Sequence, residues 1–387
     1  MKLKTGPILL AFLCMGFGDA IGPFVGLAQE KFVLSNFEAQ FIAFAGFIMF
    51  LILSIPMGIL QDRIGKKAIL VIGLSSALLG VIIPLFGLER YPLFLITVML
   101  LGAGNAIMQV AGNPIMRDVS AEGRYSRNLV FGQFVKAIGS FTGPVIPVIA
   151  KNFFSSDWSV LFPIYAVSIF ITLISVISLK TGEKKEEGQQ PATLKSCYSL
   201  LRNPYILFMV LGIFFYVGAE VCMSSGVPIY LKNQFGIDIQ KTGLAGTGLF
   251  FLALLIGRLS GGIILNWLSA GKFFILTTVL SVAGILGLFM GSQTLGFIST
   301  FVIGLGFANI FPLIFSITVE SMPERTNELS GLMVTAIVGG ALVPPLMGAV
   351  ADLTSVLTGF LVPLACVVYL FVIALVDFKK TKNIAPV

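Results

Sequence analysis

The chain has 387 residues, of which 57% are hydrophobic and 11% are charged, against a usual charged share of about 25%. A water-soluble protein of this size could not cover its surface with so few polar groups. The composition therefore predicts a protein that crosses a bilayer several times. The formal net charge of +7 lies mainly in short connectors between apolar segments, and we therefore expect no nucleic-acid partner.

Apolar segments of about 20 residues recur along the whole chain, and helix is the structure that pairs every backbone group inside a membrane. The first segment contains Asp19 and no small-residue cleavage pattern follows it, so we interpret it as a permanent span. The twelve predicted spans are 6–27, 37–60, 68–88, 92–115, 128–150, 159–179, 205–228, 242–265, 273–290, 294–318, 329–350 and 356–376.

The longest polar connector divides the chain into two halves. The sequence predicts a six-helix bundle over 1–180, a cytoplasmic linker over 181–204 with a short surface helix near 194–201, and a second six-helix bundle over 205–387. With a cytoplasmic N-terminus, the connectors and tails on that side hold 18 Lys and Arg residues, and the opposite connectors hold 5. This bias predicts that both termini are cytoplasmic. We expect a monomer that crosses a bacterial inner membrane repeatedly.

Short patterns in the first half return in the second. Gly-Ala-Gly at 102–104 reappears as Gly-Leu-Gly at 304–306, and the segment 58–62 has a counterpart at 262–266. Each match alone is weak because glycine is common in membrane helices. Their nearly equal offsets, 202 and 204 residues, nevertheless favour a parallel six-helix repeat.

Four ionisable residues lie deep inside the apolar segments: Asp19, Lys136, Glu220 and Arg258. A charge at the centre of a membrane helix costs at least about 2.5 kcal/mol, so such residues serve pairing, an ion path or a substrate. The two acids are 201 residues apart, and we expect them to face one cavity from opposite walls. The chain has no histidine, which makes Asp19 and Glu220 the candidate cation-coupling sites.

The two buried bases have different expected roles. Lys136 could bind an anionic group of the substrate, pair with Asp19 or Glu220 and release on protonation, or act as a structural counter-ion. Arg258 is predicted nearer the cytoplasmic end of its helix. For Arg258 we favour a structural role, either reaching the membrane surface or binding backbone carbonyl groups.

Four buried amides complete the candidate substrate site. Amides offer both donors and acceptors, which suits a polyhydroxylated solute, but they can equally well join helices to one another. Together with Lys136, the candidate substrate-binding residues are Asn105, Gln109, Gln133 and Asn309.

The connector after the second span reads Gly58-Ile-Leu-Gln-Asp62-Arg63-Ile-Gly-Lys-Lys67. It resembles the signature loop of the major facilitator superfamily, although an ordinary basic connector is the alternative interpretation. Gly58 would allow close helix contact, Asp62 would cap or pair with a neighbouring helix end, and Arg63 would face the anionic leaflet. We therefore expect these residues, with Arg258, to act in conformational gating.

Further stretches resemble the fucose permease branch of that superfamily. They are 34–40, 112–114, 216–220, 256–258, 311–316 and 337–348. The resemblance implies an all-α membrane protein with twelve helices in two pseudo-symmetric bundles, a central cavity, alternating access and cation-coupled sugar uptake. The branch's functional aspartate and glutamate align here with Gly22 and Gln109, so neither acid is carried over. We expect the coupling site to have moved, with Asp19 about one turn earlier on the same helix face. The expected substrate is a sugar or a sugar-derived solute, either neutral or anionic.

Two other functions stay open at this stage. The segment 139–144 partly resembles the antiporter motif of proton-coupled drug exporters, and a sensor or scaffold of the same fold would bind without transporting. An enzyme is not expected, since the chain lacks a histidine base, a phosphate-binding glycine loop and paired cysteines. No cofactor or metal centre is expected; the coupling ion is a proton or sodium, and sodium would bind at Asp19.

Overall fold

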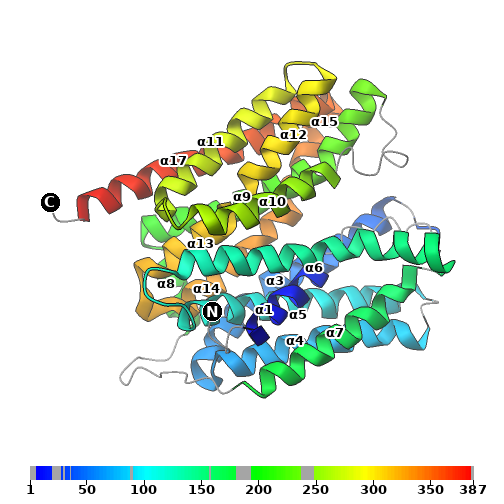
Figure 1. The fold of residues 1–387 in the computed structure, drawn as a ribbon, viewed down its shortest axis with the longest axis horizontal. Coiled ribbons are helices and arrows are strands. Elements are labelled where there is room, and N and C mark those ends of the chain that lie inside the picture. Colours follow the sequence, from blue (N-terminus) through cyan, green and yellow to red (C-terminus); the bar gives the residue numbers. More distant parts are fainter. Residues whose placement is uncertain are drawn as a thin grey trace. The chain divides into compact units, whose positions relative to one another are not determined.

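The computed structural model describes residues 6–19, 28, 31–34, 36–87, 90–156, 158–179, 193–236 and 248–384. Within these ranges every regular element is a helix (Figure 1). Nine of the described helical stretches are long and apolar enough to cross a membrane, and α1 and α10 are shorter apolar helices. The predicted all-helical fold is confirmed, while the count of twelve spans and the cytoplasmic termini stay predictions.

The chain divides into two compact units. Unit 1 comprises 1–125, 132–200 and 322–335. Its elements are α1 (Gly6–Asp19), α3 (Asn36–Ile64), α4 (Lys66–Ile82), η2 (Ile83–Phe86), α5 (Tyr91–Asp118), most of α6 (Tyr125–Phe154), η3 (Trp158–Val160), α7 (Leu161–Ile177), α8 (Leu194–Leu200), η5 (Pro323–Arg325) and α14 (Thr326–Thr335).

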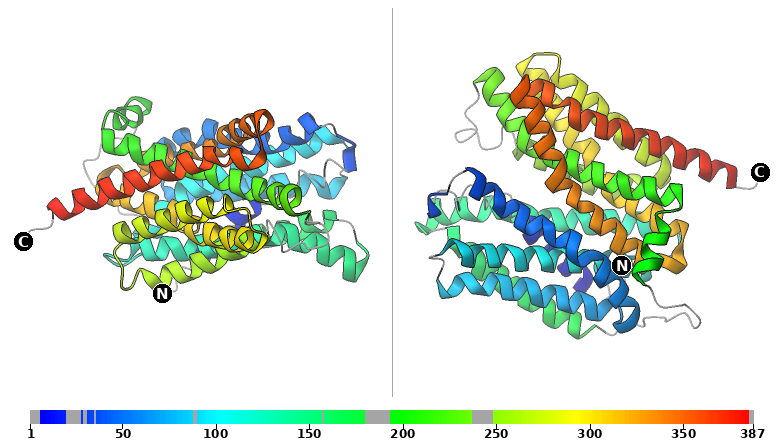
Figure 2. Two further views of the ribbon diagram at one scale, coloured as in Figure 1. Left: turned by 90° about the horizontal axis from the view of Figure 1, so that it is seen from above. Right: turned by 180° about the vertical axis from the view of Figure 1, so that it is seen from behind.

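Unit 2 comprises 126–131, 201–321 and 336–387. The red helix that leads to the C-terminus in Figure 2 is α17, which packs along α9 and α11. The elements of unit 2 are α9 (Pro204–Phe235), α10 (Leu249–Ile264), α11 (Ala270–Leu288), α12 (Gln293–Phe307), α13 (Ile310–Ser321), η6 (Ala336–Val338), α15 (Gly339–Leu353), α16 (Val356–Gly359) and α17 (Leu361–Ile384).

The domain bounds predicted from the sequence stay a prediction. In the structure, the short segment 126–131 groups with unit 2 and the segment 322–335 groups with unit 1. Residues 181–192 of the predicted linker lie outside the described residues, whereas α8 occupies the place of the predicted short helix. Residues 20–27 of the first predicted span and 242–247 of the eighth also lie outside the described part of the chain.

The core of unit 1 surrounds α5, in which every residue from Leu101 to Met116 is buried. Pro114 lies inside this helix and has no N–H group. The carbonyl of Val110, one turn before it, therefore lacks its usual backbone donor. The Ser330 hydroxyl of α14 donates to that carbonyl at 2.7 Å. The proline thus leaves an acceptor that ties α14 to the buried helix.

The same arrangement occurs in unit 2, where the predicted span 294–318 is two helices rather than one. The break lies at Ala308 and Asn309, between α12 and α13. Pro312 cannot donate to the Ala308 carbonyl, and the Arg258 Nε atom donates to it at 3.2 Å instead. The predicted span 329–350 is likewise divided among α14, η6 and α15.

Candidate functional site

The last residue of α1 and the middle of α6 bring opposite charges together in unit 1. The Lys136 Nζ atom lies 3.0 Å from Asp19 Oδ2, and the side chains of these residues are 11% and 36% exposed, respectively. Of the two partners expected for Lys136, the structure places Asp19 beside it. The carboxylate offsets the cost of burying the ammonium group.

Close contact of α1 with α6 depends on two glycines. A Cβ atom on Gly16 would lie 2.2 Å from the Lys136 carbonyl oxygen, and one on Gly139 would lie 2.1 Å from the Leu13 carbonyl oxygen. Any side chain at either position would push the helices apart. The spacing Gly16-Phe-Gly-Asp19 therefore positions the carboxylate against α6 by removing side-chain volume one turn before it.

The Asp19 carboxylate also accepts two neutral hydrogen bonds. Asn105 Nδ2 donates to Oδ1 at 3.1 Å, and the Ser140 hydroxyl donates to Oδ2 at 3.1 Å. Behind Asn105, Gln109 Nε2 donates to Asn105 Oδ1 at 3.1 Å. One network thus joins four predicted site residues, Asp19, Lys136, Asn105 and Gln109. Ser140 also belongs to it and was not predicted from the sequence.

Gln133 is buried in the same helix as Lys136, three residues before it and therefore on the same side of α6. It completes the part of the candidate site that unit 1 contains. Within the described residues, no group of three or more His, Cys, Asp or Glu side chains could hold a metal ion.

Unit 2 contains the second pair of buried charges. The Arg258 Nη2 atom of α10 lies 3.6 Å from Glu220 Oε1 of α9, and these side chains are 12% and 22% exposed. The hydrogen bond from Arg258 to the Ala308 carbonyl agrees with the predicted binding of a backbone group, while its pairing with Glu220 was not foreseen. That Asp19 and Glu220 face one shared cavity stays a prediction.

Asn309 lies at the break between α12 and α13 and is 1% exposed. Its Nδ2 atom donates to the Gly257 carbonyl at 2.8 Å, next to Arg258. Asn309 therefore joins α10 to the helix break. In the structure its donor is used between helices, which was the alternative to a substrate-binding role.

The signature segment is helical rather than a loop, because α3 continues to Ile64 and the turn is made by Gly65 with a φ of 91°. A Cβ atom on Gly58 would lie 2.9 Å from the Asn327 carbonyl oxygen. Asp62 accepts a hydrogen bond from Asn327 Nδ2, and Gln61 donates to Asn327 Oδ1 at 2.9 Å. Asp62 therefore contacts the start of α14, and Arg63 is exposed at the end of α3. The gating role of these residues stays a prediction.

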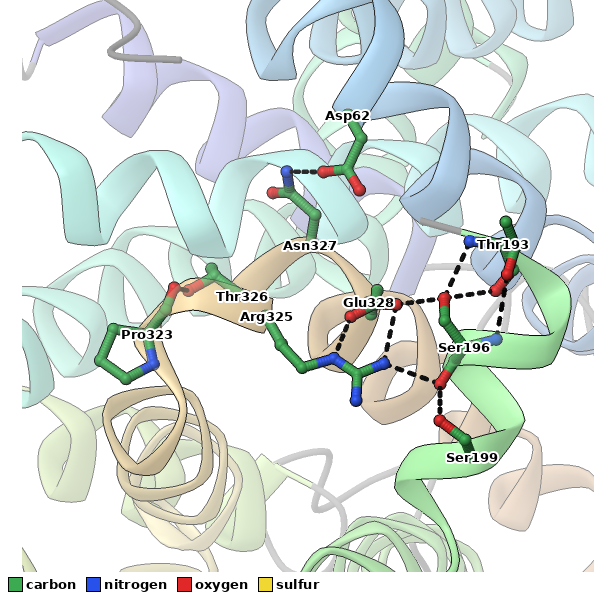
Figure 3. A network of polar contacts seen from close by, with 9 residues as sticks. All are labelled: Asp62, Thr193, Ser196, Ser199, Pro323, Arg325, Thr326, Asn327 and Glu328. Atoms are coloured by element: carbon green, nitrogen blue, oxygen red, sulfur yellow. Dashed lines mark hydrogen bonds and ion pairs between the residues drawn. The ribbon is translucent and has the colours of Figure 1, made fainter. Parts of the chain in front are cut away.

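A polar cluster beside that contact joins α8 to η5 and α14, and Figure 3 shows its members. Arg325 pairs with Glu328 and donates to the Ser196 carbonyl at 2.8 Å, while the Ser196 hydroxyl donates to Glu328. The next residue on α8, Cys197, is 1% exposed, and burial together with the Glu328 charge raises the pKa of its thiol to about 12. Sequence reasoning missed this cluster, since its halves are separated by about 130 residues and no local pattern links them.

Helices long enough to span a bilayer, with oppositely charged side chains paired between them, define a polytopic membrane protein built for solute or ion movement. Comparison with known proteins agrees. A model of the Major Facilitator Superfamily matches residues 8–344. A glucose/galactose transporter of Brucella abortus is 29% identical over 391 residues, covering 96% of this chain and 93% of the relative.

The L-fucose-proton symporter of Escherichia coli K12 is 25% identical over 380 residues, covering 89% of this chain and 86% of the relative. The crystal structure of FucP, a Major Facilitator Superfamily transporter in the outward conformation, superimposes with a TM-score of 0.84 at 22% identity. The superposition covers 97% of this chain and 99% of the FucP chain. The chain belongs to the major facilitator superfamily, and it is a multi-pass membrane transporter, not an enzyme.

Proposed function

We propose that this transporter takes up a sugar or a sugar-derived solute together with a cation, by alternating access between the two sides of the membrane. The named activities of the Brucella and Escherichia relatives support a sugar as substrate. The buried amides supply donors and acceptors of the kind that hydroxyl groups need. In this proposal the protein is a monomer in a bacterial inner membrane, and both of its termini are cytoplasmic. It uses no nucleic-acid partner and no cofactor.

The observation that carries this proposal is the ion pair of Asp19 and Lys136. Protonation of the carboxyl would remove the charge that holds the ammonium, leaving Lys136 able to interact with a substrate oxygen. Release of the proton would restore the pair and weaken the hold on substrate. Proton binding and substrate binding would then favour each other, which is the requirement for symport.

The groups around Asp19 favour a proton over sodium as the coupling ion. Sodium would need carboxylate oxygens free of hydrogen-bond donors, yet Asn105 donates to Oδ1, and Lys136 and Ser140 both approach Oδ2. A proton binds to only one of the two carboxylate oxygens, so it displaces only the hydrogen-bond donors on that oxygen. Because the Asp19–Lys136 pair has no net charge, it favours a neutral sugar; a sugar acid would have to compete with Asp19 for the ammonium.

Flux measurements on purified protein in liposomes test the proposal. Entry of glucose, galactose and fucose is measured with an inward proton gradient, with an inward sodium gradient, and with neither. Accumulation that follows the proton gradient supports the proposal. Accumulation that follows only the sodium gradient would show that sodium, and not the proton, is the coupling ion. Opposite results in right-side-out and everted vesicles separate uptake from proton-coupled export, and binding without counterflow would indicate a sensor or scaffold.

A further inference from the structure

One face of α5 carries amides at every fourth position. Asn105, Gln109 and Asn113 are each separated by four residues and lie along about 12 Å of helix. Their exposed fractions are 2%, 1% and 0%. Asn105 is bonded to Asp19, so this row begins at the candidate coupling site and continues towards the C-terminal end of α5.

The hydrogen bonding of the row is complete at its first residue and becomes incomplete along the helix. Gln109 donates to Asn105, but no partner for its Oε1 atom exists among the described residues. For Asn113, neither Nδ2 nor Oδ1 has a partner in the described part of the chain. Unpaired buried donors and acceptors cost roughly 1–3 kcal/mol each, so this apolar interior holds polar groups with a use beyond packing.

Other polar groups lie at the same level of α5. The Tyr125 hydroxyl donates to the Asn113 carbonyl at 3.2 Å, and the Ser330 hydroxyl donates to the Val110 carbonyl that Pro114 leaves open. Two hydroxyl groups and the Asn113 amide therefore lie within one turn of α5, close to the interruption in its backbone hydrogen bonds. Buried water in proteins sits where two to four such groups converge.

We propose that Gln109 and Asn113 hold water molecules in a route along α5 that carries protons between Asp19 and the C-terminal end of that helix, an inference that rests on the proposed proton symport. The protonated Asp19 carboxyl gives its proton to water, the O–H bond of the carboxyl breaks, and an oxonium ion passes the charge along the row. The carboxylate left behind pairs again with Lys136. The amides do not titrate; they orient the water, and Asn113 is therefore a positioning residue.

The orientation of the chain gives this route a direction. With cytoplasmic termini, α5 starts at the outer side with Tyr91 and ends at the cytoplasmic side with Asp118. The row of amides thus runs from Asp19 towards the end of α5 that would be cytoplasmic. In symport the proton that enters with the substrate must leave on the inner side, and this row would give it a way there.

The test compares Asn113→Leu with the wild-type protein in liposomes that contain a pH-sensitive dye. Leucine has a similar size and cannot bind water, so sugar-coupled proton entry and gradient-driven uptake should fall by at least about tenfold. Counterflow of glucose, galactose or fucose at equal pH on both sides should stay within about twofold, because substrate binding does not involve Asn113. Asn113→Ser, which keeps a polar group and room for water, should recover most of the coupled rate.

Thr97→Val is the matched control, because Thr97 is buried in the same helix and its hydroxyl donates to the Leu93 carbonyl one turn earlier. It should leave all rates unchanged. Normal coupled proton entry in Asn113→Leu would overturn the inference while the proposed function stands. Equal loss of counterflow and coupled uptake would also overturn it, since that result indicates a structural role. Absence of proton-coupled uptake in the wild type would refute the proposed function and this inference together.

Discussion

Lys136 on α6 and Asp19 on α1 form an ion pair inside unit 1, with the Nζ and Oδ2 atoms 3.0 Å apart. A second pair, Arg258 with Glu220, lies inside unit 2. In each unit, a base and an acid of that same unit thus form an ion pair. A transporter that moves two bundles relative to each other can keep both pairs formed during that motion, and only ligand or proton binding needs to break them.

The Arg258–Glu220 pair predicts a stability difference between single and double variants. Arg258→Met leaves the Glu220 carboxylate and the Ala308 carbonyl without this donor, and we expect it to destabilise the protein by about 3 kcal/mol. Adding Glu220→Gln should recover part of the loss, because the second change removes the uncompensated charge. Melting temperatures in detergent measure both effects. Lys272→Met, which removes an exposed positive charge from α11, is the control and should change little.

Neutralising Asp19 should alter which solutes bind. In Asp19→Asn the Lys136 ammonium has no carboxylate partner, so a substrate carboxylate can replace it. We expect glucuronate and galacturonate to stabilise this variant, with binding at least about tenfold tighter than to the wild type. Thermal shift titrations with these acids, and with glucose and galactose for comparison, measure the change. Adding Lys136→Met should abolish the gain; equal acid binding with and without Lys136 would contradict this role.

The close contact of α1 and α6 predicts sensitivity to a single methyl group. Gly139→Ala places a Cβ atom against the Leu13 carbonyl oxygen and must move one helix, at a cost of about 1–3 kcal/mol. The displacement should also weaken the Asp19–Lys136 contact and reduce coupled uptake. Gly348→Ala on α15 is a matched control, because its new methyl group would meet nothing within 4 Å. Similar melting temperatures for the two variants would show that the contact is not tight.

The cluster around Arg325 predicts a change in thiol reactivity. Cys197 is buried and its raised pKa, about 12, keeps it as the unreactive thiol at neutral pH. Arg325→Ala removes the donor to the Ser196 carbonyl and should let α8 leave α14, increasing alkylation of Cys197 by at least about tenfold. Mass spectrometry of the Cys197 peptide after maleimide treatment gives the rate. Lys195→Ala, which removes a neighbouring exposed charge on α8, should have no effect.

Much of the fold follows from apolar length alone. The predicted span 92–115 is α5, Tyr91–Asp118, because a continuous apolar run in a membrane has only helix available to it. The sequence does not reveal where such a run breaks. The interruption at Ala308 and Asn309 depends on Pro312 and on a tertiary hydrogen bond from Arg258 that replaces the missing backbone bond.

The candidate site was predictable in its residue types and not in its pairing. Asp19, Lys136, Glu220 and Arg258 stand out in the sequence because charge is costly in an apolar span. Which acid meets which base depends on helix packing, and Gly16 and Gly139 decide it in unit 1 by allowing α1 to approach α6. The contact of Ser196 with Glu328 joins distant segments through polar residues of types that are common in any sequence, so no local signal could have found it.

We propose that Asp19 couples proton movement to sugar uptake through its pair with Lys136. The most direct measurement compares gradient-driven accumulation and counterflow of sugar in liposomes containing the wild-type protein or Asp19→Asn. We expect Asp19→Asn to lose accumulation and to keep measurable counterflow, because it can bind and exchange substrate but cannot take up the proton. Accumulation by Asp19→Asn equal to that of the wild type would contradict it.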